Sequence, residues 1–352
     1  MTDKKNNIIP HSRPWITNSD INIVNDILCS GMVSKGSMVN KFEELVKSYT
    51  GARGAIALGS GTAALILGLN VLGVRKGDEV ILPTYVCRSV LEAVLNTGGI
   101  PILCDVNEKG TITADSVEPL LTEKTKVIIA VHIFGHSCDI KDIKNFNIPV
   151  IEDACQAFGL KIKGKPAGGL GDLGILSFNG TKCLTTGEGG MLLLNHAGER
   201  DYAYDNSLNK KISLSNRLTP MSDIQASLGL SQLSRYDQFV KRRLQLRTQY
   251  DQTCDKSGLN IGGDPISNML FRYTIRTLSE FEIIQNYFQK QGVSVRRGVD
   301  ELLHRILGFK DESFPTASRL FKQTVSLPFY PGLKDEEFDI ILRSINRMTD
   351  VD

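Results

Sequence analysis

Short apolar runs alternate with segments of helical periodicity through the first half of the chain. The runs that predict strands lie at residues 55–58, 79–82, 101–104, 126–131, 150–152, 174–178 and 191–194. Between several of them, apolar residues recur with the spacing of a helix, at residues 62–72, 89–96, 116–121 and 139–145. Such alternation is typical of a mostly parallel sheet flanked by helices.

Beyond residue 195 the pattern changes. Residues 222–250 have the periodicity of one long helix, with Ser222 as a candidate N-terminal cap. Apolar runs and helical patterns then follow at residues 269–275, 280–291, 293–297 and 334–348. We therefore predict an α/β fold with two domains. A large domain over residues 1–245 holds a mostly parallel seven-stranded sheet flanked by helices, and a smaller α+β domain covers residues 246–352.

Composition excludes several classes of protein. The chain has 352 residues, 41% hydrophobic and 23% charged, which is ordinary for a soluble globular protein. A net charge of +2 indicates neither a nucleic-acid partner nor a membrane-surface partner. No apolar run is long enough to span a bilayer, and the polar N-terminus does not resemble a signal peptide. The seven scattered cysteines predict reduced thiols in a cytoplasmic protein, and no metal site is expected.

The candidate chemistry lies in three polar side chains near the ends of two predicted strands. Asp153 follows one apolar run, Ser177 ends the next, and Lys182 comes shortly after. Ligands of such sheets bind at the carboxyl ends of strands, so these side chains are expected to meet. Pyridoxal phosphate is held by three kinds of group: an acid that faces the ring nitrogen, a hydroxyl that binds the phosphate, and a lysine that forms the imine. Taken singly, Lys182 could be a solvated lysine and Asp153 a helix cap or a member of a buried salt bridge.

A second candidate element follows the first predicted strand. Residues 59–65 join that strand to a helix, and the glycines there let backbone N–H groups approach an anion. This segment would then complete a phosphate site with Ser177. The alternative is a simple helix start capped by a serine or threonine. Gln156 has two interpretations as well, since it could reach the cofactor's ring oxygen or cap a turn.

These motifs together resemble the DegT/DnrJ/StrS family of pyridoxal-phosphate sugar aminotransferases, which have the aspartate aminotransferase fold (fold type I). The resemblance spans nearly the whole chain, with motifs at residues 31–36, 60–65, 131–135, 151–157, 177–190, 223–226 and 326–333. It implies that Lys182 forms the imine, Asp153 pairs with the pyridinium nitrogen and Gln156 contacts the ring oxygen. It also implies phosphate contacts from Ser177, Gly61 and Thr62, and a homodimer with sites at the subunit interface.

Three segments depart from the family's pattern. The usual aromatic pattern after Pro83 is replaced, and Tyr85 is the candidate for stacking on the cofactor ring. Asn216 is the candidate for reaching the partner subunit's phosphate, although that assignment requires a shift of register. The loop at residues 296–304 differs from the common sugar-binding loop, which indicates a different acceptor. Arg88, Arg296 and Arg297 could meet substrate phosphates, and their plainer interpretation is that they are solvated arginines.

The sequence thus predicts a cytoplasmic, pyridoxal-phosphate-dependent aminotransferase. The resemblance implies that it transfers an amino group from L-glutamate to a nucleotide-linked keto-sugar. The amino-sugar product would serve polysaccharide or lipopolysaccharide biosynthesis. Two alternatives stay open. One is a dehydratase of the same family, which has histidine in place of the imine lysine, so that Lys182 argues against it. The other is a non-catalytic regulatory protein on the same fold.

Overall fold

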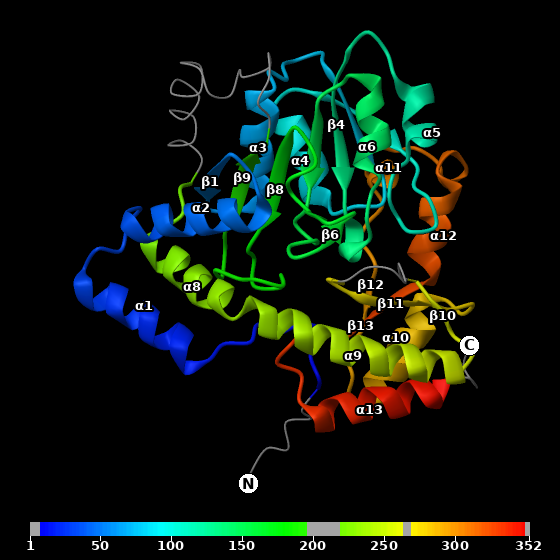
Figure 1. Cartoon of the computed structure of the whole chain (residues 1–352). Helices are drawn as coiled ribbons and strands as arrows, with labels where there is room; N and C mark the ends of the chain where they lie inside the picture. Colours follow the sequence, from blue (N-terminus) through cyan, green and yellow to red (C-terminus); the bar gives the residue numbers. More distant parts are fainter. Residues whose placement is uncertain (1–7, 196–218, 263–268, 349–352) are drawn as a thin grey trace.

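A seven-stranded sheet forms the centre of the larger part of the molecule in the computed structural model, which describes residues 8–195, 219–262 and 269–348 (Figure 1). Its strands are β1 (Gly54–Leu58), β2 (Glu79–Pro83), β3 (Ile100–Cys104), β4 (Thr125–Val131), β5 (Val150–Asp153), β8 (Leu173–Ser177) and β9 (Gly190–Leu194). They lie in the order β1-β9-β8-β5-β4-β2-β3. Only β9 runs antiparallel to its neighbours in this sheet; the other pairs are parallel. The predicted strands and the mostly parallel sheet are confirmed.

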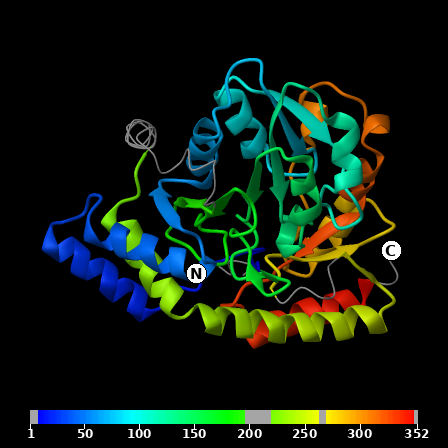
Figure 2. The same ribbon diagram turned by 45° about the horizontal axis from the view of Figure 1, so that its top comes forward.

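The sheet is buried on both faces, as the unbroken apolar strands require. On β9, Met191 and Leu193 pack into one apolar cluster, whereas Leu192 and Leu194 pack into another. Figure 2 shows helices on both sides of the strands. The helices of this part are α1 (Asn18–Ser30), α2 (Ser37–Thr50), α3 (Gly61–Val71), α4 (Arg88–Asn96), α5 (Ala114–Val117) and α6 (Ile140–Ile143). A short hairpin of β6 (Lys161–Ile162) and β7 (Lys165–Pro166) follows β5.

The two N-terminal helices, α1 and α2, were not predicted from the pattern. Each ends at a glycine in the left-handed conformation, Gly31 with φ 71° and Gly51 with φ 72°, where any other residue would be strained. Both helices pack against α8 (Asp223–Ser234), far away in sequence. The Asp223 carboxylate accepts the backbone N–H groups of Gly36 and Val39, at 2.8 and 3.0 Å, and so caps the start of α2.

The predicted long helix at residues 222–250 is wrong in one respect, because the structure has two helices there. α8 ends at Ser234, and the next residue, Arg235, has φ −112° and ψ 9°. α9 (Tyr236–Lys256) begins directly afterwards. The Arg235 guanidinium donates to the Asp20 carboxylate of α1 at 2.6 Å. No glycine or proline marks this break. The partner of Arg235, Asp20, lies in a helix far away in the sequence, so local periodicity could not predict the break.

The C-terminal part holds an antiparallel four-stranded sheet in the order β10-β11-β13-β12. Its strands are β10 (Asn260–Ile261), β11 (Tyr273–Arg276), β12 (Arg296–Arg297) and β13 (Thr324–Leu327). Its helices are α10 (Phe281–Lys290), α11 (Leu303–Ile306), α12 (Pro315–Gln323) and α13 (Asp335–Asn346), and α13 lies beside α9 in both views. The predicted smaller α+β unit is confirmed. The proposed boundary between residues 245 and 246 falls inside α9 and stays a prediction.

Two classes of feature are absent from the ranges that the structure describes. No helix in them combines the length and the apolar character needed to cross a membrane. No group of histidine, cysteine, aspartate and glutamate side chains in them could hold a metal ion.

Candidate active site

The ends of β5 and β8 meet the beginning of α3. β5 ends at Asp153 and β8 at Ser177. A methyl group added to Gly61, the first residue of α3, would lie 2.9 Å from the Ser177 Cβ and 3.3 Å from the Cys155 Sγ. Only glycine permits this close approach without displacing its neighbours. The predicted meeting of these elements is therefore seen in the structure.

The start of α3 serves as a capped helix and as a potential anion site at once. The Ser60 hydroxyl accepts the N–H of Ala63 at 3.1 Å, which is an ordinary N-terminal cap. The first N–H groups of a helix have no partner within it, so those of Gly61 and Thr62 can still bind an anion. Ser177 lies beside them, and its oxygen accepts the Asn179 N–H at a long 3.5 Å. Its hydroxyl proton can therefore be donated to a phosphate oxygen.

Asp153 is a buried acid whose charge is not matched by a protein cation. Its side chain is 5% exposed, and its Oδ1 accepts the backbone N–H of Cys155 at 3.0 Å. Within the described ranges no lysine, arginine or histidine forms an ion pair with it, which counts against the salt-bridge interpretation. A buried carboxylate without a cation is costly. It fits a ligand that brings its own positive charge, such as a protonated pyridine nitrogen.

Gln156 has a fixed orientation. Its amide oxygen accepts the backbone N–H of Phe134 at 2.9 Å, at a turn where Phe134 has φ 57°. Since that oxygen faces a donor, the amide nitrogen is left to donate to an acceptor such as a ring oxygen. The two interpretations of Gln156 are thus compatible.

Lys182 lies in the wall of a pocket and not on the open surface. Its Nζ is 5.0 Å from the centre of the Phe271 ring. Burial and Asp153 raise the pKa of the Cys155 thiol well above its ordinary value, and Lys182 acts in the opposite direction. Asp153 and Lys182 thus both influence the same thiol, and their convergence on one cofactor ring stays a prediction.

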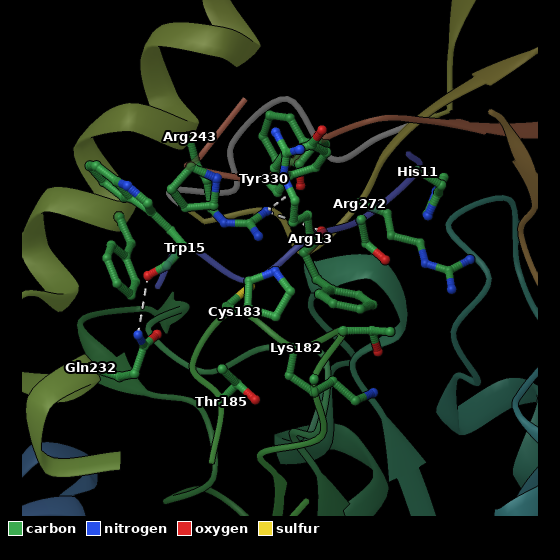
Figure 3. A pocket seen from close by; sticks show the side chains of 18 of the residues that line it. His11, Arg13, Trp15, Lys182, Cys183, Thr185, Gln232, Arg243, Arg272 and Tyr330 are labelled. Carbon is green, nitrogen blue, oxygen red and sulfur yellow. Dashed lines mark hydrogen bonds between the residues drawn. The ribbon is translucent and has the colours of Figure 1, made fainter. Parts of the chain in front are cut away.

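Figure 3 shows the pocket around Lys182, which encloses about 630 Å³ with its open mouth included. Its walls come from the N-terminal segment at His11 and Trp15, from α9 at Arg243 and from Arg272 before β11. The sequence analysis did not identify these four residues. Of the arginines that could meet a substrate phosphate, Arg296 does line the pocket.

Two of the predicted cofactor contacts receive no support from the geometry. Tyr85 is 1% exposed in the core, with its ring edge-on to Phe134 at 6.2 Å. Burial raises the pKa of Tyr85 to about 12. Its hydroxyl has no hydrogen-bond partner in the described part of the chain. Its role in ring stacking stays a prediction, and Asn216 lies outside the described residues.

Glu152, next to Asp153, holds β5 in place from the other face, and the sequence analysis assigned it no role. It is fully buried, and its carboxylate accepts the N–H groups of Gly168, Leu170 and Gly171 at 2.6, 2.6 and 2.9 Å. The His132 Nε2 donates to it at 2.9 Å, because the Nδ1 of that ring accepts another backbone N–H. Burial raises the pKa of Glu152, but these hydrogen bonds outweigh it, and the net pKa lies below the usual value.

Replacing Glu152 with glutamine should destabilise the fold by about 3 kcal/mol, since an amide NH₂ would then face backbone donors in a buried site. The lowered pKa gives the sign of the pH effect. The stabilisation is complete above the ordinary glutamate pKa and is lost as the pH falls through the lower folded value. Urea denaturation at several pH values should therefore show a difference between the two proteins that shrinks in acid. The exposed Glu44→Gln is the control, and equal midpoints for Glu152→Gln and wild type would contradict the role of Glu152.

Two serines at the α3 site should behave differently when each is changed to alanine. Ser177→Ala removes a hydrogen bond to a charged group and should weaken cofactor binding roughly 10-fold or more. The stability of the cofactor-free protein should change little. Ser60→Ala should instead reduce stability by about 1 kcal/mol through loss of the helix cap. Equilibrium dialysis and thermal denaturation separate the two effects, and a reversed pattern would show that Ser60 is the phosphate contact.

Comparison with known proteins agrees with this arrangement. A profile described as the DegT/DnrJ/EryC1/StrS aminotransferase family matches residues 14–346. The GDP-perosamine synthase of Escherichia coli O157:H7 is 32% identical over 364 residues, which cover 96% of this chain and 98% of that protein. The UDP-4-amino-4-deoxy-L-arabinose–oxoglutarate aminotransferase of Shewanella sediminis is 34% identical over 267 residues, which cover 70% of this chain and 69% of that protein.

A solved structure is similar over almost its entire length. Spr1654 from Streptococcus pneumoniae, provisionally described as a sugar aminotransferase, has a TM-score of 0.89 in its PLP form at 28% identity. The match covers 97% of this chain and 99% of that one. The PMP form of the same protein gives a TM-score of 0.88. The similarity therefore includes both sheets and the strand ends that carry Asp153 and Ser177.

Proposed function

Since the chain belongs to the DegT/DnrJ/EryC1/StrS aminotransferase family of pyridoxal-phosphate enzymes, we propose that it transfers an amino group from L-glutamate to a nucleotide-linked keto-sugar. The observation that carries the proposal is the meeting of three elements, in which β5 ends at the buried Asp153, β8 ends at Ser177 and α3 begins at Gly61. The product would be an amino-sugar, made for polysaccharide or lipopolysaccharide biosynthesis.

The cofactor, when bound, supplies an electron sink for the exchange of the amino group. Around it, Asp153 would balance the charge on the ring nitrogen, and the Gln156 amide nitrogen would donate to the ring oxygen. Ser177 and the N–H groups of Gly61 and Thr62 would hold the phosphate. Lys182 would bind the cofactor covalently and, once released, move the proton at the reacting carbon. Positioned proton transfer of this kind contributes roughly 10²- to 10⁴-fold to a rate.

The substrate assignment draws on the relatives. One is named for GDP-perosamine synthesis and another for an aminotransfer that involves oxoglutarate and a UDP-linked amino-sugar. Oxoglutarate is what L-glutamate becomes on losing its amino group. For this chain we therefore propose a nucleotide-linked acceptor and glutamate as donor. Lys182 counts against the dehydratase alternative, in which histidine stands at that position.

We also propose a cytoplasmic homodimer. Several apolar side chains of α1 and the segment after it are exposed, including Ile21 at 50%, Leu28 at 52% and Met32 at 74%. A second copy of the chain that covers them would remove this apolar surface from water.

The proposed cytoplasmic location rests on the cysteines. All seven are free thiols, which suits a reducing compartment.

The test is a pair of half-reactions on the purified, cofactor-loaded protein. Addition of L-glutamate should change the absorption spectrum of the bound cofactor and release oxoglutarate. Addition of a suitable nucleotide-linked keto-sugar should then restore the first spectrum, and a panel of such sugars would identify the acceptor. No spectral change with glutamate or another amino acid would favour the regulatory alternative. A change that no keto-sugar reverses would contradict the sugar acceptor.

A further inference from the structure

Several cations and no acid are among the described residues that line the pocket around Lys182, although Asp300 is near enough to Arg272 to act on its pKa. The described lining of the pocket includes Lys182, Arg243, Arg272 and Arg296, but neither an aspartate nor a glutamate. Arg13 also reaches the pocket, although it is paired with Glu337 at 3.2 Å. Cations that lie close together repel one another, and an anion that binds between them relieves this repulsion.

Arg272 is the best placed of these cations. Its Nη1 donates to the carbonyl oxygens of Arg297 and Gly298 at 3.1 and 2.8 Å, which fixes the plane of the guanidinium. Its Nε is buried and has no hydrogen-bond partner in the part of the chain that the structure describes. An arginine whose guanidinium is held in place, and whose remaining N–H groups can still donate, is well suited to bind a carboxylate or a phosphate.

Arg272 and Lys182 face the same aromatic ring. The Arg272 guanidinium carbon lies 5.6 Å from the centre of Phe271, and the Lys182 Nζ lies 5.0 Å from it. Figure 3 shows both side chains on the same side of the pocket, with His11 beside Arg272. A molecule whose anionic group is held at Arg272 can therefore present another of its atoms to Lys182.

Arg296 adds a second, exposed cation on the same side. Burial, together with the positive charges of Arg272 and Arg296, lowers the pKa of His11 to about 3. Both arginines therefore lie near His11, which stays neutral at physiological pH and bonds to the Ser326 hydroxyl at 2.9 Å. The neutral ring leaves the two guanidinium groups as the charges that an incoming anion meets.

We infer that Arg272 and Arg296 form an oxyanion subsite for the substrate, which binds a carboxylate or phosphate group while the reacting carbon meets Lys182. The inference rests on the proposed function and deepens it. The subsite is separate from the cofactor's own phosphate site, which lies at the start of α3 beside Ser177. Two substrates carry the required chemistry, namely the carboxylates of the amino donor and the phosphates of the nucleotide-linked acceptor.

Binding at this subsite can be measured by the fluorescence of a tryptophan in the pocket. Trp15 is the only tryptophan of the sequence and lines the same pocket. Its fluorescence can be followed while the cofactor-loaded protein is titrated with glutarate or with inorganic pyrophosphate. Neither probe can accept or donate an amino group, so the titration does not depend on turnover. We expect saturable binding of at least one probe, glutarate if the donor uses the subsite and pyrophosphate if the acceptor does.

Four variants make the assignment specific. Arg272→Met should weaken binding of that probe about 10- to 100-fold, as expected for a lost hydrogen bond to a charged group. Arg272→Lys should recover part of the loss. Arg296→Met should also weaken binding, and it alone decides the question if Arg272→Met does not fold, because Arg296 is exposed. The control is Arg343→Gln, an exposed arginine of α13 that removes the same charge outside the pocket.

Two results would overturn the inference. One is the absence of saturable binding of either probe to the wild-type protein. The other is binding to Arg272→Met and Arg296→Met that is as tight as to wild type. The half-reactions above are scored separately, so a protein that binds the probes but transfers no amino group would contradict only the proposed function. A protein that transfers amino groups but whose binding is insensitive to these arginines would contradict only the subsite.

Discussion

Lys182→Ala is expected to abolish covalent attachment of the cofactor and to lower amino transfer by at least about 10⁴-fold, the upper end of what positioned proton transfer contributes. The physical reason is that this amine has two tasks, the covalent bond and the proton transfer, and alanine can perform neither. The geometry supports the choice of this lysine, since its Nζ lies over Phe271 in the pocket wall and both it and Asp153 act on the Cys155 thiol.

Borohydride reduction followed by peptide mass mapping measures the attachment directly. In the wild-type protein the cofactor should be found on the peptide that contains Lys182, and in the variant no labelled peptide should remain. Far-UV circular dichroism should be unchanged, because Lys182 makes no ion pair in the described part of the chain. Lys141→Ala, an exposed lysine of α6, serves as the matched control. Full labelling at another lysine would show that Lys182 had been wrongly assigned.

Asp153→Asn is expected to lower the rate about 10²- to 10³-fold, the size of effect seen when one preorganised electrostatic group is removed. The asparagine has nearly the same shape but cannot balance a positive ring nitrogen. The ring nitrogen of the bound cofactor should therefore lose its proton at a lower pH than in the wild-type protein. A spectroscopic pH titration of the loaded variant measures this shift.

Stability gives an independent check on Asp153. In the cofactor-free protein its carboxylate is buried and has no ion-pair partner among the described residues, so the neutral asparagine should leave the free energy of unfolding unchanged or raise it. A structural aspartate would show the opposite, a loss of stability along with activity. Asp153→Glu keeps the charge and should retain more activity than Asp153→Asn. If Asp153→Asn were as active as wild type, the pairing with the ring nitrogen would be wrong.

Much of the fold could be predicted because its signals are local. An apolar strand buried on both faces reads as an unbroken apolar run, as at residues 127–131, and the alternation with helices indicates the parallel sheet. The meeting of Asp153 with Ser177 and Gly61 followed from the same reasoning, since the ends of parallel strands share one edge. Glycine at position 61 is also a local signal, which the structure explains by the close approach to Ser177.

What could not be predicted depends on contacts between segments far apart in the chain. The break between α8 and α9 occurs where Arg235 contacts Asp20, and no glycine or proline near the break predicts it. The support of Asp153 by Glu152 depends on His132, which belongs to a different segment. Hydrophobic periodicity describes one element at a time and carries no information about such partners.

The sequence by itself determined the strands of a mostly parallel sheet and the order of Asp153, Ser177 and Lys182 along the chain, because strand pattern and strand-end chemistry are properties of neighbouring residues. Only the tertiary structure decided what surrounds Lys182. His11 comes from the N-terminal segment, whereas Arg272 and Arg296 come from the C-terminal part, and they meet because the C-terminal sheet packs against the N-terminal segment. The shared positive charge of the two arginines beside the neutral His11 is a property of that packing.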